Sequence, residues 1–223
     1  MQASPFSPPL AALVPLVAVL LGVAAPLLAD PAHYISRGAA WRYFRGLEEA
    51  SSPDTTAWRR QDYDDAAWKE GAAPFGFGDP PYGTDLSRLD PPMRNNYSSL
   101  FLRRAFDLSD GMRVVDLEVN ADYDDGFILW LNGVEILRIN VNGQLGDPVT
   151  FDGLAASNRE PGEYVNLGLQ DAKQHLVTGT NVIAVQAFNF TRSNPDFKID
   201  LELFDPFGPD LLPPTVAFTV PGP

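Results

Sequence analysis

The chain has 223 residues, 45% hydrophobic and 20% charged, so it is long enough and apolar enough for one folded domain with a buried core. Its formal net charge of -13 makes nucleic-acid phosphates and anionic membrane surfaces poor partners. Because the chain has no cysteine, disulfides, thiolate catalysis and cysteine-ligated zinc are excluded.

The first 29 residues differ in composition from the rest of the chain. From Leu10 to Leu21 the residues are almost all Ala, Leu and Val, and Ala29 offers a small residue before Asp30. This pattern is typical of a signal peptide with its cleavage site. We therefore expect residues 1–29 to be a signal peptide and the protein to be secreted, into the extracellular space or the periplasm. Because no Lys or Arg precedes the apolar run, a retained anchor or a misassigned start stays an alternative.

Between residues 30 and 205 the sequence has the pattern of an all-β protein. Short apolar or alternating runs recur between Gly, Asn, Asp and Pro residues, and helical periodicity is almost absent. A helical turn is predicted only within 55–68, with Asp64 or Asp65 as its cap. Eight short antiparallel strands predict a two-sheet β-sandwich of the jelly-roll type. The predicted strands are 39–45, 100–107, 113–121, 126–131, 134–140, 162–168, 182–189 and 197–204.

The clearest local signal is Asn132-Gly133, which lies between two apolar runs. Both central residues of a type I′ turn need a positive φ, which Asn and Gly adopt readily, so this pair predicts a β-hairpin. With the turn at this place, Leu129 should face Ile136. The run 126–131 is apolar on both faces, which predicts a central strand whose outer face is covered or used.

Alternating strand directions place four loops at the same end of the predicted sandwich. Surface loops on a rigid scaffold carry binding residues more often than other segments do, so this end is the expected ligand site. The four loops are 76–99, 122–125, 141–161 and 190–196.

Seven motifs, taken together and in order, carry a family resemblance. They resemble a galactose-binding-domain-like jelly roll, as in the sugar-binding β-sandwich domain of family 2 glycoside hydrolases and in stand-alone modules of large secreted bacterial proteins. The resemblance covers about residues 35–205. It implies a fold shared by carbohydrate binders and by modules that only support neighbouring domains. Where family members often have a histidine, this chain has Phe188-Asn189. The motifs are WRYFRG (41–46), DYDDAAWKEG (62–71), APFGFGD (73–79), FLRRAFDL (101–108), YDDGFILWLNGVEILRIN (123–140), LVTGTNVIAVQAFN (176–189) and DFKIDLELF (196–204).

Asp122, Asp124 and Asp125 form the carboxylate cluster with the density expected of a metal site. Calcium takes six to eight hard oxygen ligands, which closely spaced aspartates and turn carbonyls supply. The pattern also resembles that of adhesin domains in which adjacent aspartates hold calcium. Ordinary turn chemistry, with each carboxylate accepting nearby backbone N–H groups, is the alternative. Ca²⁺ is therefore a candidate ligand, and no other cofactor is expected.

Six side chains at the loop-rich end are candidates for binding a ligand. Flat aromatic faces match the apolar faces of pyranose rings, and Arg or Asn side chains can hydrogen-bond to sugar hydroxyls. As alternatives, Tyr97 packs its own loop and the arginines solvate an acidic surface. Trp130, on the outer face of its strand, is expected to be covered by the N-terminal segment rather than to form an exposed platform. The six candidates are Tyr82, Arg94, Asn95, Tyr97, Asn189 and Arg192.

No enzyme signature is present in the sequence. It has no glycine-rich phosphate loop, no nucleophile elbow and no paired-histidine zinc motif. Of its two histidines, His33 lies just after the predicted cleavage point, and His175 falls in a loop at the opposite end from the acidic turn. A non-catalytic protein is therefore predicted.

Together these patterns predict a secreted carbohydrate-binding or accessory module of a larger modular protein. Its expected partners are a glycan or another extracellular polymer and neighbouring domains, with no nucleic acid and no membrane. The Pro-rich residues 206–223 predict a linker and the start of a further domain, or else a short structureless tail. A β-sandwich with no ligand of its own, or the front part of a secreted hydrolase, is the alternative.

Overall fold

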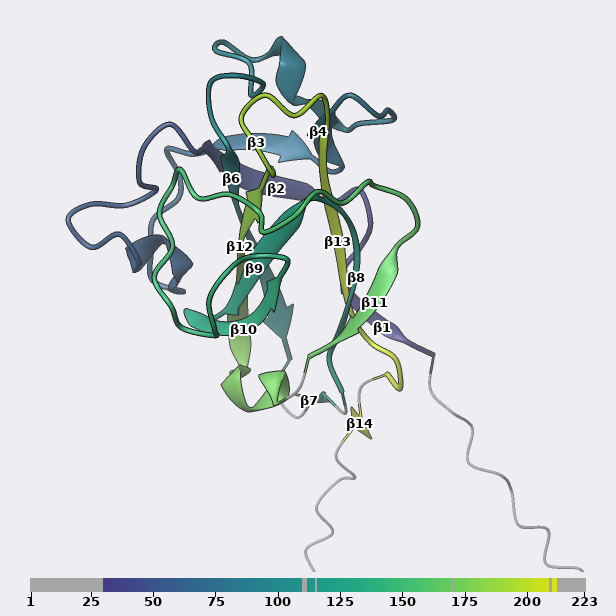
Figure 1. The fold of residues 1–223 in the computed structure, drawn as a ribbon. Coiled ribbons are helices and arrows are strands. Elements are labelled where there is room, and N and C mark those ends of the chain that lie inside the picture. Colours follow the sequence, from purple (N-terminus) through teal and green to yellow (C-terminus); the bar gives the residue numbers. More distant parts are fainter. Residues whose placement is uncertain (1–29, 110–111, 115, 170, 209, 212–223) are drawn as a thin grey trace, which may run out of the picture.

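Two β-sheets lie face to face in the computed structural model of the protein, which describes residues 30–109, 112–114, 116–169, 171–208 and 210–211 (Figure 1). The predicted signal peptide lies outside these residues, as does most of the segment 206–223. Within the described ranges, no helix combines the length and the hydrophobicity needed to cross a membrane.

The first sheet, called sheet A here, has the strand order β11-β8-β13-β4-β5, and β1 also pairs with β13. The second, sheet B, has the order β10-β9-β12-β6-β2-β3. All pairings are antiparallel except β4 with β5. The predicted all-β, two-sheet antiparallel sandwich is therefore confirmed. The strands of sheet A are β1 (Ala32–Ile35), β4 (Phe75–Phe77), β5 (Thr84–Asp85), β8 (Glu118–Asp124), β11 (Val165–Gly168) and β13 (Phe197–Asp205). Those of sheet B are β2 (Ala40–Arg45), β3 (Lys69–Ala72), β6 (Ser99–Leu108), β9 (Gly126–Leu131), β10 (Val134–Ile139) and β12 (Gly179–Phe188).

Short elements complete the chain, and some of them differ from the predictions. The predicted strand 113–121 begins only at Glu118, and a separate β7 (Met112–Arg113) pairs with β14 (Asp210–Leu211) instead. The predicted helical turn is η1 (Ala57–Arg59), which follows Thr56 rather than Asp64 or Asp65. Two other 3-10 turns are η2 (Leu86–Arg88) and η3 (Ala172–His175).

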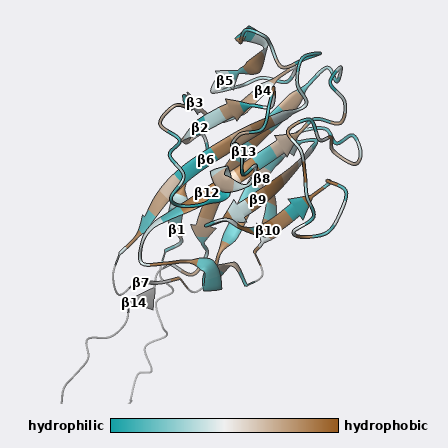
Figure 2. Ribbon diagram, turned by 90° about the vertical axis from the view of Figure 1, so that its left-hand side faces the viewer, coloured by the Kyte–Doolittle hydropathy of each residue, from teal (hydrophilic) through white to brown (hydrophobic). Residues whose placement is uncertain are grey.

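The main core fills the space between the two sheets. Alternate residues of each strand point inward, so Tyr123 of β8 and Ile199 of β13 meet Phe127 and Leu129 of β9 in one buried cluster. Figure 2 shows the hydrophobic residues concentrated along these strands and the hydrophilic ones along the connecting loops. Burial of this apolar surface contributes most of the free energy that holds the two sheets together.

A second core covers the outer face of sheet B. The segment that carries η1 lies over this face, with the Trp58 and Trp130 rings edge to face at 5.3 Å between centroids. The Arg59 guanidinium lies 4.3 Å from the Trp130 ring centre. Trp130 is therefore covered, as predicted, and the apolar character of both faces of β9 is explained. This second core consists of Ala50, Trp58, Trp68, Phe101, Ile128, Trp130, Ala155, Ala184 and Phe188.

The β9–β10 hairpin forms where the sequence predicts it. Asn132 and Gly133 have φ of 52° and 90°, as a type I′ turn requires. The predicted facing of Leu129 with Ile136 is wrong, because a bulge at Ile136 makes Leu129 face Leu137. An inserted residue shifts every later side chain of that strand by one position.

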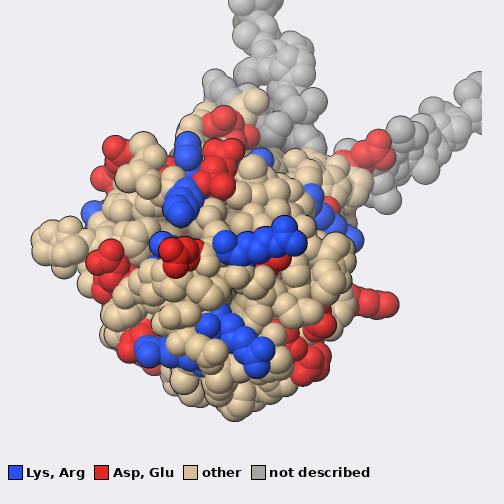
Figure 3. Space-filling model, turned by 90° about the horizontal axis from the view of Figure 1, so that it is seen from above, with Lys and Arg blue, Asp and Glu red and all other residues tan. Residues whose placement is uncertain are grey.

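The four loops meet at one end of the sandwich, as predicted. The backbone N–H of Asn95 donates to the Arg192 carbonyl at 2.6 Å, which joins loop 76–99 to loop 190–196. The Ala155 N–H donates to the Asn189 carbonyl at 3.1 Å, which joins loop 141–161 to the same place. β1 and β14 lie at the opposite end (Figure 1). Seen from above, the loop-rich end carries both acidic and basic side chains (Figure 3).

Candidate binding site at the loop-rich end

A row of polar side chains runs along the outer face of sheet A. Because residues alternate across a strand, the positions on β8 and β13 that do not enter the core carry Asn120, Asp122, Lys198, Asp200 and Glu202. Buried polar groups need partners, and most members of this row find them in one another. The Asp122 carboxylate, for example, contacts the Lys198 ammonium at 2.9 Å and accepts a hydrogen bond from the Gly162 N–H at 3.1 Å.

Asp125, just beyond the upper end of this row, ties the loops together. Its side chain is fully buried and accepts hydrogen bonds from the Arg159 N–H at 2.7 Å, the Phe190 N–H at 2.5 Å and the Asn194 amide at 3.2 Å. This carboxylate therefore has the structural role that turn chemistry predicts, over a longer range than one turn.

Asp124 is different from both of its predicted companions. It is 1% exposed, and neither of its carboxylate oxygens has a hydrogen-bond partner among the described residues. Burial, and then the nearby charges of Asp125 and Asp196, raise the pKa of Asp124 to about 9. Of the three predicted metal residues, Asp122 and Asp125 are thus engaged with protein groups and Asp124 is not.

Three further carboxylates, which the sequence analysis did not single out, lie at the same place. Ligand oxygens of Asp79, Glu160 and Asp196 are all within 4.8 Å of one another. Gly78, with φ of 93°, makes this possible, because a Cβ there would lie 2.5 Å from the Cβ of Asp196. These acids are far apart in the sequence, and the shared end of their loops is the only signal that could have grouped them.

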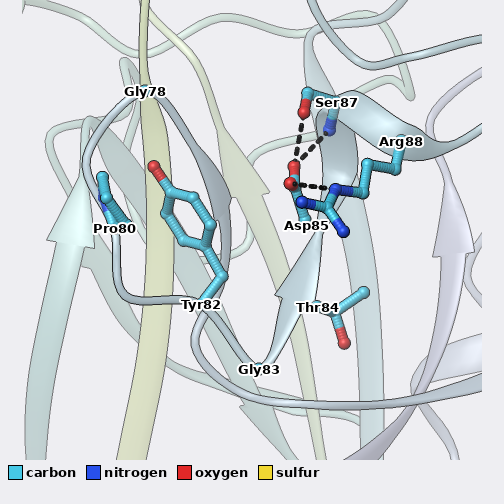
Figure 4. Close-up of a pocket in the computed structure, with 8 residues that line it drawn as sticks. All are labelled: Gly78, Pro80, Tyr82, Gly83, Thr84, Asp85, Ser87 and Arg88. Atoms are coloured by element: carbon cyan, nitrogen blue, oxygen red, sulfur yellow. Dashed lines mark hydrogen bonds and ion pairs between the residues drawn. The ribbon is translucent and has the colours of Figure 1, made fainter.

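Beside these acids is an open hollow of about 710 Å³ (Figure 4). The Tyr82 ring stands on one side of it, against Gly76, where an added Cβ would lie 2.9 Å from a ring carbon. On the other side, Asp85 accepts hydrogen bonds from the N–H and hydroxyl of Ser87 at 2.9 and 2.5 Å and contacts the Arg88 guanidinium at 3.0 Å. The hollow is lined by Gly78, Pro80, Tyr82, Gly83, Thr84, Asp85, Ser87 and Arg88.

The other predicted ligand residues lie at the same end but in different surroundings. Arg94 and Asn95 are exposed, and the Arg192 side chain is exposed with its guanidinium 3.9 Å from Asp152. Tyr97 is 1% exposed, and burial raises the pKa of its hydroxyl. Asn189 is fully buried, and its amide donates to the Asp196 carbonyl at 3.2 Å. Tyr82 is the predicted residue that lines the hollow.

The two histidines lie away from this end. His33 on β1 contacts Glu202 at 3.0 Å between Nδ1 and the carboxylate, and its backbone is paired with Phe204 near the end of β13. His175 closes η3, where its carbonyl accepts a hydrogen bond from the Asn132 amide at 2.8 Å. The position of His175 agrees with the sequence-based expectation that it lies away from the acidic turn.

The fold of the chain is similar to that of parts of several solved structures. No protein-family model matches the chain, and no curated protein matches it. It is similar to Bifidobacterium dentium β-glucuronidase complexed with coumarin-3-O-glucuronide, at 15% identity and a TM-score of 0.42, over 71% of this chain and 20% of that one. A Bacteroides vulgatus β-glycosidase gives 13% identity, a TM-score of 0.39, and 80% and 20% coverage. Ruminococcus gnavus β-glucuronidase gives 12% identity, a TM-score of 0.46, and 81% and 30% coverage. The chain thus spans 20% to 30% of these enzymes, and the similarity concerns the fold alone.

Proposed function

We propose that the protein is a non-catalytic carbohydrate-binding module of a larger exported protein, and that it contacts its ligand through the loop-rich end. The observation that supports this most is the hollow between Tyr82 and the Asp85–Arg88 pair, which combines one aromatic face with convergent polar groups. Its volume of about 710 Å³ is in the range of small-molecule sites.

The polar groups on one side of the hollow are preorganised to bind hydroxyl groups. Asp85 is fixed by Ser87 and Arg88, so its carboxylate does not need to be ordered when a ligand arrives. The Arg88 side chain is 84% exposed, which leaves its other N–H donors free to meet a ligand. Paired hydroxyls of a sugar suit such donors and acceptors, while its C–H face suits the Tyr82 ring.

Such a site supports weak binding. It offers a few hydrogen bonds and one ring contact, and the open shape leaves much of a ligand in water. We expect dissociation constants of about 10⁻⁴ to 10⁻³ M for a single sugar site, with avidity supplied by other modules of the same protein.

A structural or interaction module without its own ligand is the second candidate. It is favoured by the loops' internal bonding, since Asp125 has three donors and Asn189 and Tyr97 are buried. In that case the loop-rich end holds a neighbouring domain, and the hollow has no sugar to bind.

A glycan array with the purified chain separates the two candidates. We expect the chain to bind one class of glycan on the array. Tyr82→Ala and Arg88→Ala should each lower the affinity for that glycan at least about tenfold. Phe190→Ala is the matched control, because Phe190 is a 37% exposed aromatic residue at the same end that does not line the hollow. No retention of any glycan, or equal losses in Phe190→Ala and Tyr82→Ala, would overturn the carbohydrate proposal.

A further inference from the structure

The three clustered carboxylates come from three different loops. Asp79 follows β4, Glu160 belongs to the loop before β11, and Asp196 directly precedes β13. Like charges held this close repel one another unless a cation or a proton lies between them. In the described part of the chain, no lysine, arginine or histidine forms an ion pair with any of the three.

Asp124 is the independent observation that points to a ligand at this cluster. In the ladder between β8 and β13 it lies opposite Lys198, and Asp196 is two residues before Lys198 on the same face. Its side chain therefore leaves the sheet on the same face as that of Asp196, and it feels the charges of both Asp196 and Glu160. It is 1% exposed, and both of its oxygens lack partners among the described residues.

Two neighbouring cations, Lys198 and Arg159, contact other groups. Lys198 lies opposite Asp124 in the sheet, but its ammonium contacts Asp122 at 2.9 Å. Arg159 precedes Glu160, but its guanidinium lies 3.9 Å from the Tyr123 ring centre and donates to the Glu160 carbonyl at 3.1 Å rather than to the Glu160 carboxylate. Among the described residues, four acidic side chains thus lie near one another, and the two cations beside them are directed to other groups.

We propose that Asp79, Asp124, Glu160 and Asp196 bind one divalent cation of calcium's class. Calcium accepts six to eight oxygen ligands in irregular geometry, and carboxylates from separate loops provide hard oxygens of this kind. Magnesium demands a near-ideal octahedron, and zinc prefers the nitrogen and sulfur ligands that this cluster does not contain. The set shares only Asp124 with the aspartates that the sequence predicts.

A cation there clamps three loops to the end of β8. Tyr82 lies in the same loop as Asp79, and burial, followed by the charges of Asp79, Asp85, Asp196 and Asp124, raises the pKa of its hydroxyl. The ring of Tyr82 is also a wall of the hollow, so the cation fixes one side of that hollow. The cation site does not rest on the proposed function, and an empty glycan array leaves it unaffected.

Calorimetric titration of the EDTA-treated chain tests the proposal, with CaCl₂ as the probe and MgCl₂ and ZnCl₂ for comparison. We expect one Ca²⁺ per chain, with a dissociation constant between about 10⁻⁶ and 10⁻³ M and weaker Mg²⁺ binding. Asp79→Asn and Asp124→Asn should each weaken Ca²⁺ binding at least about tenfold. Asp79 is exposed, so its variant should fold, and circular dichroism checks this.

Two control variants separate this site from its alternatives. Glu163→Gln removes an exposed acid from the same loop as Glu160 and should leave Ca²⁺ binding unchanged. Asp122→Asn should change it by less than about threefold, whereas a site in the turn 122–125 would make this variant as damaging as Asp124→Asn. Absence of Ca²⁺ binding up to about 10 mM would overturn the proposal.

Discussion

Arg103 is a buried cation that donates four hydrogen bonds inside the protein. Its side chain is 3% exposed and contacts Asp65 at 2.7 Å. It also donates to the carbonyls of Arg60 at 3.0 Å and Tyr63 at 3.3 Å, and to that of Trp58. One guanidinium thereby holds the segment around η1 onto the outer face of sheet B. The apolar contacts of Trp58 alone would not fix the orientation of this segment.

We expect Arg103→Leu to lower the free energy of unfolding by about 3 kcal/mol, because it leaves Asp65 and three carbonyls without their donor. Urea denaturation measures this. Arg42→Leu, on the adjacent strand with its side chain 41% exposed, is the control and should cost less than about 1 kcal/mol. Similar losses in the two variants would contradict the role given to Arg103.

Glu202 is the most connected acid on the outer face of sheet A. It contacts Arg37 at 2.8 Å, the Asn120 amide at 2.9 Å and His33 at 3.0 Å. Burial opposes its ionisation, but the hydrogen bonds from Asn120 and Arg37 and the nearby positive charges outweigh it and lower its pKa. A carboxyl group whose pKa is lower in the folded state stabilises the protein at pH values above the pKa that it has in the unfolded chain. This contribution is lost as the pH falls through the pKa of the folded state.

Glu202→Gln should therefore destabilise the protein by about 1–2 kcal/mol at neutral pH and by progressively less below pH 4.5, the ordinary pKa of a glutamate. Chemical denaturation of both proteins over a series of pH values gives the difference. Glu70→Gln, whose side chain is 61% exposed, should show no such trend. A difference that grows as the pH falls would refute this assignment.

At the scale of elements, the β9–β10 hairpin depends on the positive φ angles of its two turn residues. Gly133 has φ of 90°, and the atom nearest to an added Cβ would be Cγ of Arg60 at 3.4 Å, which is ordinary contact. Any loss on substitution therefore comes from the backbone conformation and not from a clash.

Gly133→Ala should cost about 1–2 kcal/mol of unfolding free energy. Gly162→Ala is the matched control, because Gly162 has open space around it and no positive φ, and its stability should stay within about 0.5 kcal/mol of the parent protein. Thermal and urea denaturation of the two variants provide the comparison, and equal losses would mean that the turn does not fix the hairpin.

The same hairpin shows how far the sequence predicts this fold. The bounds of β9 agree with the predicted run 126–131, because turn residues and apolar composition are both local signals. The bulge at Ile136 has no such signal, since Ile136 and Leu137 are both apolar and both pack against the main core. Edge strands such as β3 and β5 were missed for a related reason: they are short and partly exposed, and have no apolar pattern of their own.

The candidate site was predicted less completely than the fold. Strand alternation places the loops at one end, and this much follows from the sequence. Which carboxylate is engaged depends on partners distant in the chain: the Lys198 ammonium for Asp122 and the Phe190 N–H for Asp125. Three closely spaced aspartates therefore cannot be told apart in the sequence, although they have different surroundings in the fold.

At the scale of the whole molecule, the protein has three layers rather than two. The segments around η1 and after β10 form a cover over sheet B, and this cover buries Trp58 and Trp130 to the same degree as the residues between the sheets. We infer that the cover unfolds together with the sandwich and not before it.

Trp58→Ala should accordingly cost about 3–5 kcal/mol, as much as Phe127→Ala in the main core. Phe207→Ala, at a residue 51% exposed, is the control and should cost less than about 1 kcal/mol. Tryptophan fluorescence and far-ultraviolet circular dichroism should report one coincident transition in the parent protein. A separate early fluorescence transition would show that the cover is peripheral.

The described chain enters through β1 and leaves through β14, both at the pole farthest from the loops (Figure 1). A partner joined to either of these strands would therefore be attached away from the loop-rich end. A tether placed there would leave the opposite rim unobstructed, so capture on a sensor chip by either side should give the same analyte response.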